Sequence, residues 1–201
     1  LRNPGMEKSL PELVELRKSG FDKWLNVSLS ADNPDDFITL VKAFDCVADS
    51  VELNFSCPHA KKGFGASIGC NIDIASEYVE KIHNATKDRN SLLFIKLTPN
   101  VNNIGEIAKR VIEMGADGIT AINTVGPDLH IDSTSGTPIL QNAIGGKGGK
   151  SGRWVYHRAI ECIKEIREAV GDDVPIIGMG GVWGEKECFE MIEAGADAVG
   201  V

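Results

Sequence analysis

The residues best suited to chemistry follow a short apolar run in the first third of the chain. Residues 50–53 read Ser-Val-Glu-Leu, a pattern typical of a buried parallel strand, and Asn54 and Cys57 come just after it. Enzymes with parallel sheets carry their active sites at the carboxyl ends of the strands. A thiol, with an ordinary pKa of about 8.5, can take or give a proton near neutral pH. The position therefore suits proton transfer by Cys57, although the motif alone also fits an inert thiol in a loop.

Polar side chains recur where further predicted strands end. We assign Asn26 to the end of the first strand, Lys96 to the third, and Asn123 and Thr124 to the fourth. Lys96 lies inside the apolar run Phe-Ile-Lys-Leu, and an unpaired charge at a buried position is costly. We therefore expect an anionic or strongly polar partner for Lys96, either in a functional site or in a structural ion pair.

Two glycine clusters indicate a phosphate site. Residues 145–152 contain five glycines and lead into a predicted helix, and Gly180 and Gly181 lead into another. Glycine lets backbone N–H groups approach a ligand closely, and helix amino termini favour anions. A flexible surface loop has a similar composition, but in barrels the phosphate commonly binds near the last strands.

Short apolar segments alternate with amphipathic ones along the chain, which predicts a parallel α/β sheet. Helical periodicity is clearest over residues 104–114, 154–170 and 185–194. Residues 114–119 and 194–199 resemble each other and read as the helix-to-strand corner of a repeated βα unit. The predicted strands are residues 23–29, 50–54, 92–98, 118–123, 175–179 and 197–201.

A repeated βα unit is the building block of the (β/α)8 TIM barrel. Such a barrel needs eight strands and about 250 residues, whereas only six strands are predicted within these 201 residues. We therefore expect residues 1–201 to form a single domain, an incomplete TIM barrel truncated at both ends.

Composition excludes several classes of function. A net charge of −8 disfavours nucleic acid and anionic membranes as partners, and no apolar run approaches the ~20 residues that cross a bilayer. Five cysteines without a CxxC pair favour reduced thiols in the cytoplasm. The spacing of Cys57, His59 and Cys70 matches no usual zinc pattern, so no metal site is predicted. The three tryptophans are expected to be packing groups.

Five motifs in order resemble the dihydroorotate dehydrogenase family, including the flavin domain of dihydropyrimidine dehydrogenase. They are residues 52–58 (ELNFSCP), 95–100 (IKLTPN), 115–124 (GADGITAINT), 148–152 (GGKSG) and 176–181 (IIGMGG). The resemblance implies an FMN-dependent barrel that oxidises dihydroorotate to orotate in pyrimidine biosynthesis, with hydride transfer to flavin N5.

The resemblance also implies roles for individual residues. Cys57 would be the acid/base at C5 of the ring, and Lys96 would stabilise the anionic reduced flavin. Asn54, Asn123 and Thr124 would bind the pyrimidine substrate. The implied FMN contacts are Asn26, Asn54, Lys96, Ile122, Gly152, Gly180 and Gly181.

Two branches of the family remain open. His59 and residues 63–65 resemble the branch that reduces uracil and thymine, the dihydropyrimidine dehydrogenases. Residues 3–5 and 136–140 resemble the dihydroorotate branch. A flavin-free aldolase that uses Lys96 as a Schiff base, or an inactive fragment, is a remoter alternative.

The electron acceptor cannot be assigned from the chain. It contains neither an iron–sulfur cysteine pattern nor a dinucleotide-binding fingerprint. Coupling to NAD, fumarate or quinone would then require an electron-transfer subunit or another domain. A homo-oligomer is also expected.

Overall fold

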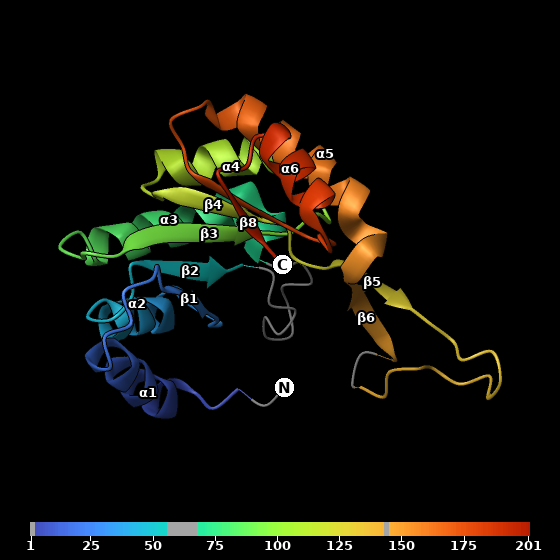
Figure 1. Ribbon diagram of the computed structural model, residues 1–201, viewed down its shortest axis with the longest axis horizontal. Helices are drawn as coiled ribbons and strands as arrows, with labels where there is room; N and C mark the ends of the chain where they lie inside the picture. The colour runs from blue at the N-terminus through green and yellow to red at the C-terminus, as the bar shows by residue number, and fades with distance from the viewer. Residues whose placement is uncertain (1–2, 56–67, 143–144) are drawn as a thin grey trace.

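A curled parallel sheet of six strands forms the centre of the molecule (Figure 1), as described by a computed structural model for residues 3–55, 68–142 and 145–201. Neighbouring strands all pair in parallel. The six predicted strands and the incomplete barrel are therefore confirmed. In order across the sheet, the strands are β1 (Asn26–Leu29), β2 (Ser50–Asn54), β3 (Leu92–Leu97), β4 (Gly118–Ala121), β7 (Ile176–Met179) and β8 (Ala198–Gly200).

Helices cover the outer face of this sheet (Figure 1). Strand residues on that face, such as Leu53, Ile95 and Ile119, are fully buried. In α4 the buried residues Ile104, Ile107 and Val111 recur at helical spacing, which explains why the segment forms a helix against the sheet. The α-helices are α1 (Met6–Lys18), α2 (Pro34–Phe44), α3 (Ile72–Ala85), α4 (Ile104–Glu113), α5 (Tyr156–Val170) and α6 (Glu185–Glu193). Within the described ranges, no helix is long and apolar enough to span a membrane.

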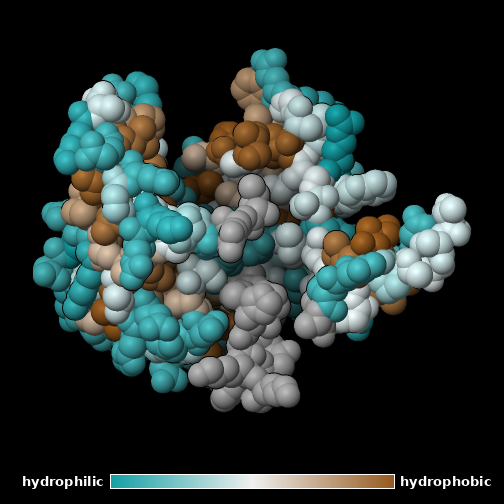
Figure 2. Space-filling view, turned by 90° about the horizontal axis from the view of Figure 1, so that it is seen from below, coloured by the Kyte–Doolittle hydropathy of each residue, from teal (hydrophilic) through white to brown (hydrophobic). Residues whose placement is uncertain are grey.

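A hairpin that the sequence does not predict interrupts the connection from β4 to α5. Its strands β5 (Val125–Leu129) and β6 (Lys147–Lys150) pair antiparallel. Part of the predicted glycine loop is thus a strand, and the prediction failed because glycine and proline are rare in strands. The hairpin arm stands apart from the body (Figures 1 and 2), and Leu129, Ile131, Ile139 and Leu140 are exposed on it.

At the amino-terminal ends of the strands, one arrangement of side chains occurs three times among the residues that the structure describes. In each, an aspartate lies just before a strand, and its carboxylate accepts a hydrogen bond from the backbone N–H of a residue at or just before the start of the neighbouring strand. The backbone N–H of the aspartate donates to the carbonyl of that residue, and an arginine donates to the same carboxylate oxygen. We call these the arginine–aspartate clasps. They consist of Arg17, Asp49 and Leu25; Arg89, Asp117 and Leu93; and Arg167, Asp197 and Ile176.

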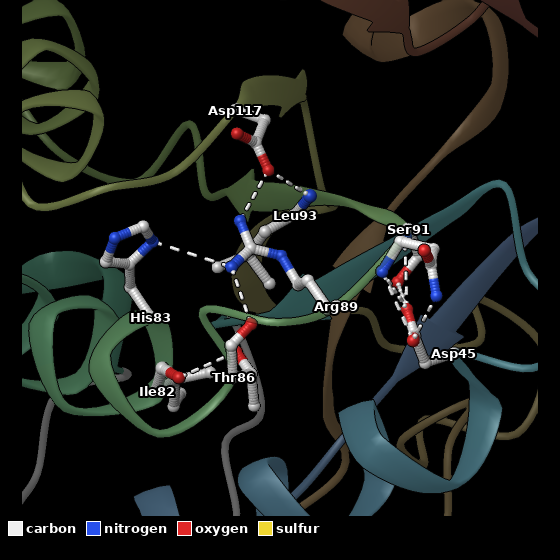
Figure 3. Close-up of polar contacts among 9 residues, drawn as sticks. Asp45, Ile82, His83, Thr86, Arg89, Ser91, Leu93 and Asp117 are labelled. Atoms are coloured by element: carbon white, nitrogen blue, oxygen red, sulfur yellow. Dashed lines mark hydrogen bonds and ion pairs between the residues drawn. The ribbon is translucent and has the colours of Figure 1, made fainter.

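Figure 3 shows the clasp of Asp117. The Leu93 N–H donates to Asp117 Oδ2 at 2.7 Å, and the Asp117 N–H donates to the Leu93 carbonyl at 2.8 Å. Arg89 Nη2 donates to the same oxygen at 2.6 Å. The repeated sequences at residues 114–119 and 194–199 contain Asp117 and Asp197, so their shared role is to set the strand register.

Two expectations are wrong. Asn26 begins β1 instead of ending it, because the apolar alternation continues through Val27 and Leu29. Its side chain accepts a hydrogen bond from Ser50 Oγ at 2.8 Å. The second concerns the tryptophans that were expected to pack: Trp24 and Trp154 are 61% and 88% exposed, whereas Trp183, 47% exposed, packs against Tyr156.

Candidate functional site

A cavity of about 330 Å³ opens at the carboxyl ends of the strands, the end opposite the clasps. Its lining comes from β3, from the segments after β4 and β7, and from the turn before α5. Seven of the residues predicted for flavin or substrate line it together: Lys96, Ile122, Asn123, Thr124, Gly152, Gly180 and Gly181. These residues are spread over more than 80 positions of the sequence, from Lys96 to Gly181, and the fold brings them into one pocket.

Amide side chains form a connected network beside the pocket. Asn123 Nδ2 donates to Asn54 Oδ1 at 2.9 Å, and the Thr124 N–H donates to Asn123 Oδ1 at 2.9 Å. Asn100 extends the network, since its Nδ2 donates to Thr98 Oγ1 at 2.9 Å and to the Thr124 carbonyl at 3.1 Å. These contacts fix Asn54, Asn123 and Thr124 relative to one another, as a site for a planar polar ring requires.

Lys96 has the anionic partner that its sequence context predicted. Its Nζ lies 3.4 Å from Glu52 Oε1 on the neighbouring strand β2. Glu52 is 3% exposed and also accepts a hydrogen bond from Ser28 Oγ at 2.8 Å. We did not single out Glu52 from the sequence. The signal was the same as for Lys96, a charged residue inside an apolar strand.

The glycines fit a bound phosphate group. Gly180 and Gly181 have φ of +128° and +74°, a region that other residues rarely adopt. A Cβ on Gly181 would lie 2.6 Å from the Gly152 carbonyl oxygen and 3.1 Å from the Tyr156 backbone nitrogen. Side chains are thus excluded where this turn approaches the start of α5, which leaves backbone groups accessible to an anion.

Tyr156, the first residue of α5, lies against the turn at Gly180 and Gly181. Burial, followed by hydrogen bonding to Glu190, raises the pKa of the Tyr156 phenol far above its ordinary value. The phenol is therefore protonated and donates to Glu190 Oε2 at 2.6 Å, which ties α5 to α6. Trp183 packs edge-on against the same ring and takes Arg153 over its face at 4.7 Å. The aromatic groups hold the glycine turn in place.

Of the predicted site residues that the structure describes, Asn54 and Asn26 do not line the pocket; Asn54 lies beside it and accepts a hydrogen bond from Asn123. Cys57 lies outside the described residues. Asn26 lies at the clasp end: it pairs with Ser50, four residues before Asn54, which is about 13 Å along a strand. The described ranges contain no group of three or more side chains suited to hold a metal ion.

The family model for dihydroorotate dehydrogenase matches residues 1–201, the whole chain. The chain belongs to the dihydroorotate dehydrogenase family. Members of this family are generally flavin-dependent, and the glycine turn and the lysine in the pocket are compatible with a flavin nucleotide.

Relatives of known name cover the chain almost completely. The catalytic subunits of dihydroorotate dehydrogenase B (NAD(+)) from Methanopyrus kandleri and Methanocaldococcus jannaschii are 37% and 38% identical to it, over 100% and 99% of the chain. Dihydroorotate dehydrogenase A (fumarate) from Lactobacillus delbrueckii is 36% identical over 100%. The chain spans 62%, 62% and 63% of these proteins.

A solved structure has the same fold. The crystal structure of the dihydroorotate dehydrogenase of Eimeria tenella, in complex with ferulenol, matches with a TM-score of 0.78 at 22% identity. The match covers 98% of this chain and 58% of that one. The similarity supports the assignment of the curled sheet as part of a TIM barrel.

Proposed function

We propose that the protein is an FMN-dependent oxidoreductase that converts dihydroorotate to orotate in pyrimidine biosynthesis. The observation that carries this proposal is the pocket at the carboxyl ends of β3, β4 and β7. A lysine and a glycine turn line it, and an ordered set of amides lies at its edge; these are the groups that a flavin nucleotide and a pyrimidine ring need. We further propose that residues 1–201 form a single FMN-binding barrel domain.

Each residue has a defined task in this proposal. FMN, when bound, supplies the acceptor for the hydride that leaves C6 of dihydroorotate. The Lys96 ammonium stabilises negative charge that develops beside it in the pocket. Asn54, Asn123 and Thr124 bind the amide and carbonyl groups of the substrate and hold the ring in place. Cys57, as thiolate, takes the proton from C5, which completes the C5–C6 double bond.

The relatives differ in the electron acceptor that their names give. Six of those compared are catalytic subunits of NAD(+) enzymes, and two use fumarate by name. We propose that this protein transfers electrons to a partner subunit, because six of the eight relatives are named catalytic subunits. Residues 1–201 themselves contain neither an iron–sulfur nor a dinucleotide pattern. Turnover with fumarate by the protein alone would contradict this part of the proposal.

Flavin binding and reduction test the main proposal. The purified protein should bind FMN stoichiometrically, and anaerobic dihydroorotate should bleach the flavin absorbance, whereas dihydrouracil should not. Bleaching by dihydrouracil alone would favour the dihydropyrimidine dehydrogenase branch. A protein that binds no FMN, but is trapped on Lys96 by borohydride with a carbonyl substrate, would indicate an aldolase.

A further inference from the structure

A buried carboxylate lies on the inner face of the sheet, beneath the pocket. Glu52 precedes the end of β2 by two residues, which places it about 7 Å below that end. It is buried, and its Oε1 accepts a hydrogen bond from the Ser28 hydroxyl and forms an ion pair with the Lys96 ammonium. Thr120 on β4 is paired with Lys96 in the sheet. The Oγ1 atom of Thr120 is buried and has no hydrogen-bond partner among the described residues.

Stability alone does not account for this pair. Taking both charges out of water costs about as much as their attraction returns, so an apolar pair of similar volume would serve a purely structural core equally well. Lys96 is the link between Glu52 and the pocket, because its side chain both lines the cavity and contacts the carboxylate. Within the described ranges, Glu52 is the only ion-pair partner of Lys96.

We propose that Glu52 is a positioning residue that acts through Lys96. It holds the ammonium at the floor of the pocket and compensates its charge, and thereby limits how strongly the pocket favours an anionic ring above it. This inference rests on the proposed function, because the ring concerned is the flavin.

The two-electron midpoint potential of bound FMN tests the inference. Glu52→Gln keeps the shape and an acceptor oxygen for Ser28 and Lys96 but removes the negative charge. We expect the reduced, anionic form to gain about tenfold over the oxidised form, a rise of about 30 mV for a two-electron couple. The matched control is Glu113→Gln, which removes a glutamate charge from an exposed pair with Arg110 on α4 and should leave the potential unchanged.

The alternatives give different results. If Glu52 is only structural, Glu52→Gln should weaken folding and FMN binding while its potential equals that of Glu113→Gln, and this result would overturn the inference. Should Glu52→Gln fail to fold, Glu52→Asp withdraws the charge from Lys96 by one methylene, and its potential should rise by a smaller amount. An unchanged potential in the aspartate variant would equally contradict the inference. A wild-type protein that binds no FMN contradicts the proposed function instead.

Discussion

At the amino-terminal ends of the strands, three clasps join an aspartate, an arginine and the backbone of a neighbouring residue by hydrogen bonds to one another. At the carboxyl ends, Lys96 and the turn at Gly180–Gly181 face a cavity instead. The same sheet therefore has one end where most polar groups pair with one another, with the buried Arg89 Nε as an exception, and one end where polar groups remain accessible to a ligand. Substitutions at the two ends should have different effects, on folding at the first and on binding and rate at the second.

The largest effect is expected at the carboxyl end. Cys57→Ala should leave FMN bound and the free energy of unfolding nearly unchanged, but should slow flavin reduction by dihydroorotate by about 10²–10⁴-fold, because a general base is lost. Stopped-flow absorbance measures this rate. Cys46→Ala, at an exposed thiol, is the control and should reduce at the wild-type rate. Equal rates in both variants would remove Cys57 from the mechanism.

A clasp substitution should have the reverse signature. Asp117→Ala leaves the Arg89 guanidinium, whose side chain is 8% exposed, without its carboxylate, and leaves the Leu93 N–H unpaired. We expect a loss of about 2–4 kcal/mol in the free energy of unfolding, measured with urea. Asp35→Ala, which breaks an exposed pair with Lys81, should cost below about 1 kcal/mol. A clasp variant as stable as this control would refute the comparison.

Two glycines of similar φ sharpen the comparison of the two ends further. Gly181→Ala adds a Cβ against the Gly152 carbonyl, so strain of about 1–3 kcal/mol falls on the pocket wall and FMN affinity should drop about tenfold or more. Gly171, with φ of +78°, has open space around its Cβ position. Gly171→Ala also carries backbone strain of about 1–3 kcal/mol, but at the end of α5 away from the pocket, so it should destabilise folding and leave FMN affinity unchanged. Fluorescence titration with FMN measures both.

The smallest expected effect is a change in how stability depends on pH in acid. The Leu25 N–H and then Arg17 hold the pKa of Asp49 below its usual range. A lowered pKa in the folded state contributes stability that is present above the unfolded pKa, about 3.9, and is lost as pH falls below it. Urea midpoints between pH 6 and pH 3 should therefore fall less steeply in Asp49→Asn than in the wild type. Parallel curves would show that this clasp does not depend on its charge.

Most of the fold could be predicted because buried parallel strands leave a strong signal. The apolar runs of β2, β3 and β4 identified the sheet, and helical periodicity identified α4 to α6. The hairpin was missed because it lies outside the core, where Gly126, Pro127 and Gly148 reveal no alternation. Its strands are stabilised by pairing with each other and not by burial, which sequence patterns report poorly.

The pocket residues that lie at the ends of strands could be predicted from the sequence. Residues whose role depends on their exact position along a strand could not. Lys96, Asn123 and Gly180 follow from their places at strand ends. Asn26 was assigned to the wrong end because its flanking residues are apolar on both sides. Glu52 escaped notice because a charge inside a strand shows its partner only once the register is known: Lys96 pairs with Asn54, two residues further along β2, and reaches Glu52 diagonally.

The clasps also bear on how the barrel folds. In each clasp the aspartate and the backbone residue are only 21 or 24 positions apart, and the arginine lies 28 to 32 positions before the aspartate, about the length of a single βα unit. Closing such short loops costs little chain entropy, and contacts of low sequence separation form early. We expect each unit to lock its own register before neighbouring units dock, so the sheet would grow strand by strand. Pulse-labelling hydrogen exchange during refolding should then find the amides of Leu25, Leu93 and Ile176 protected before those near the pocket.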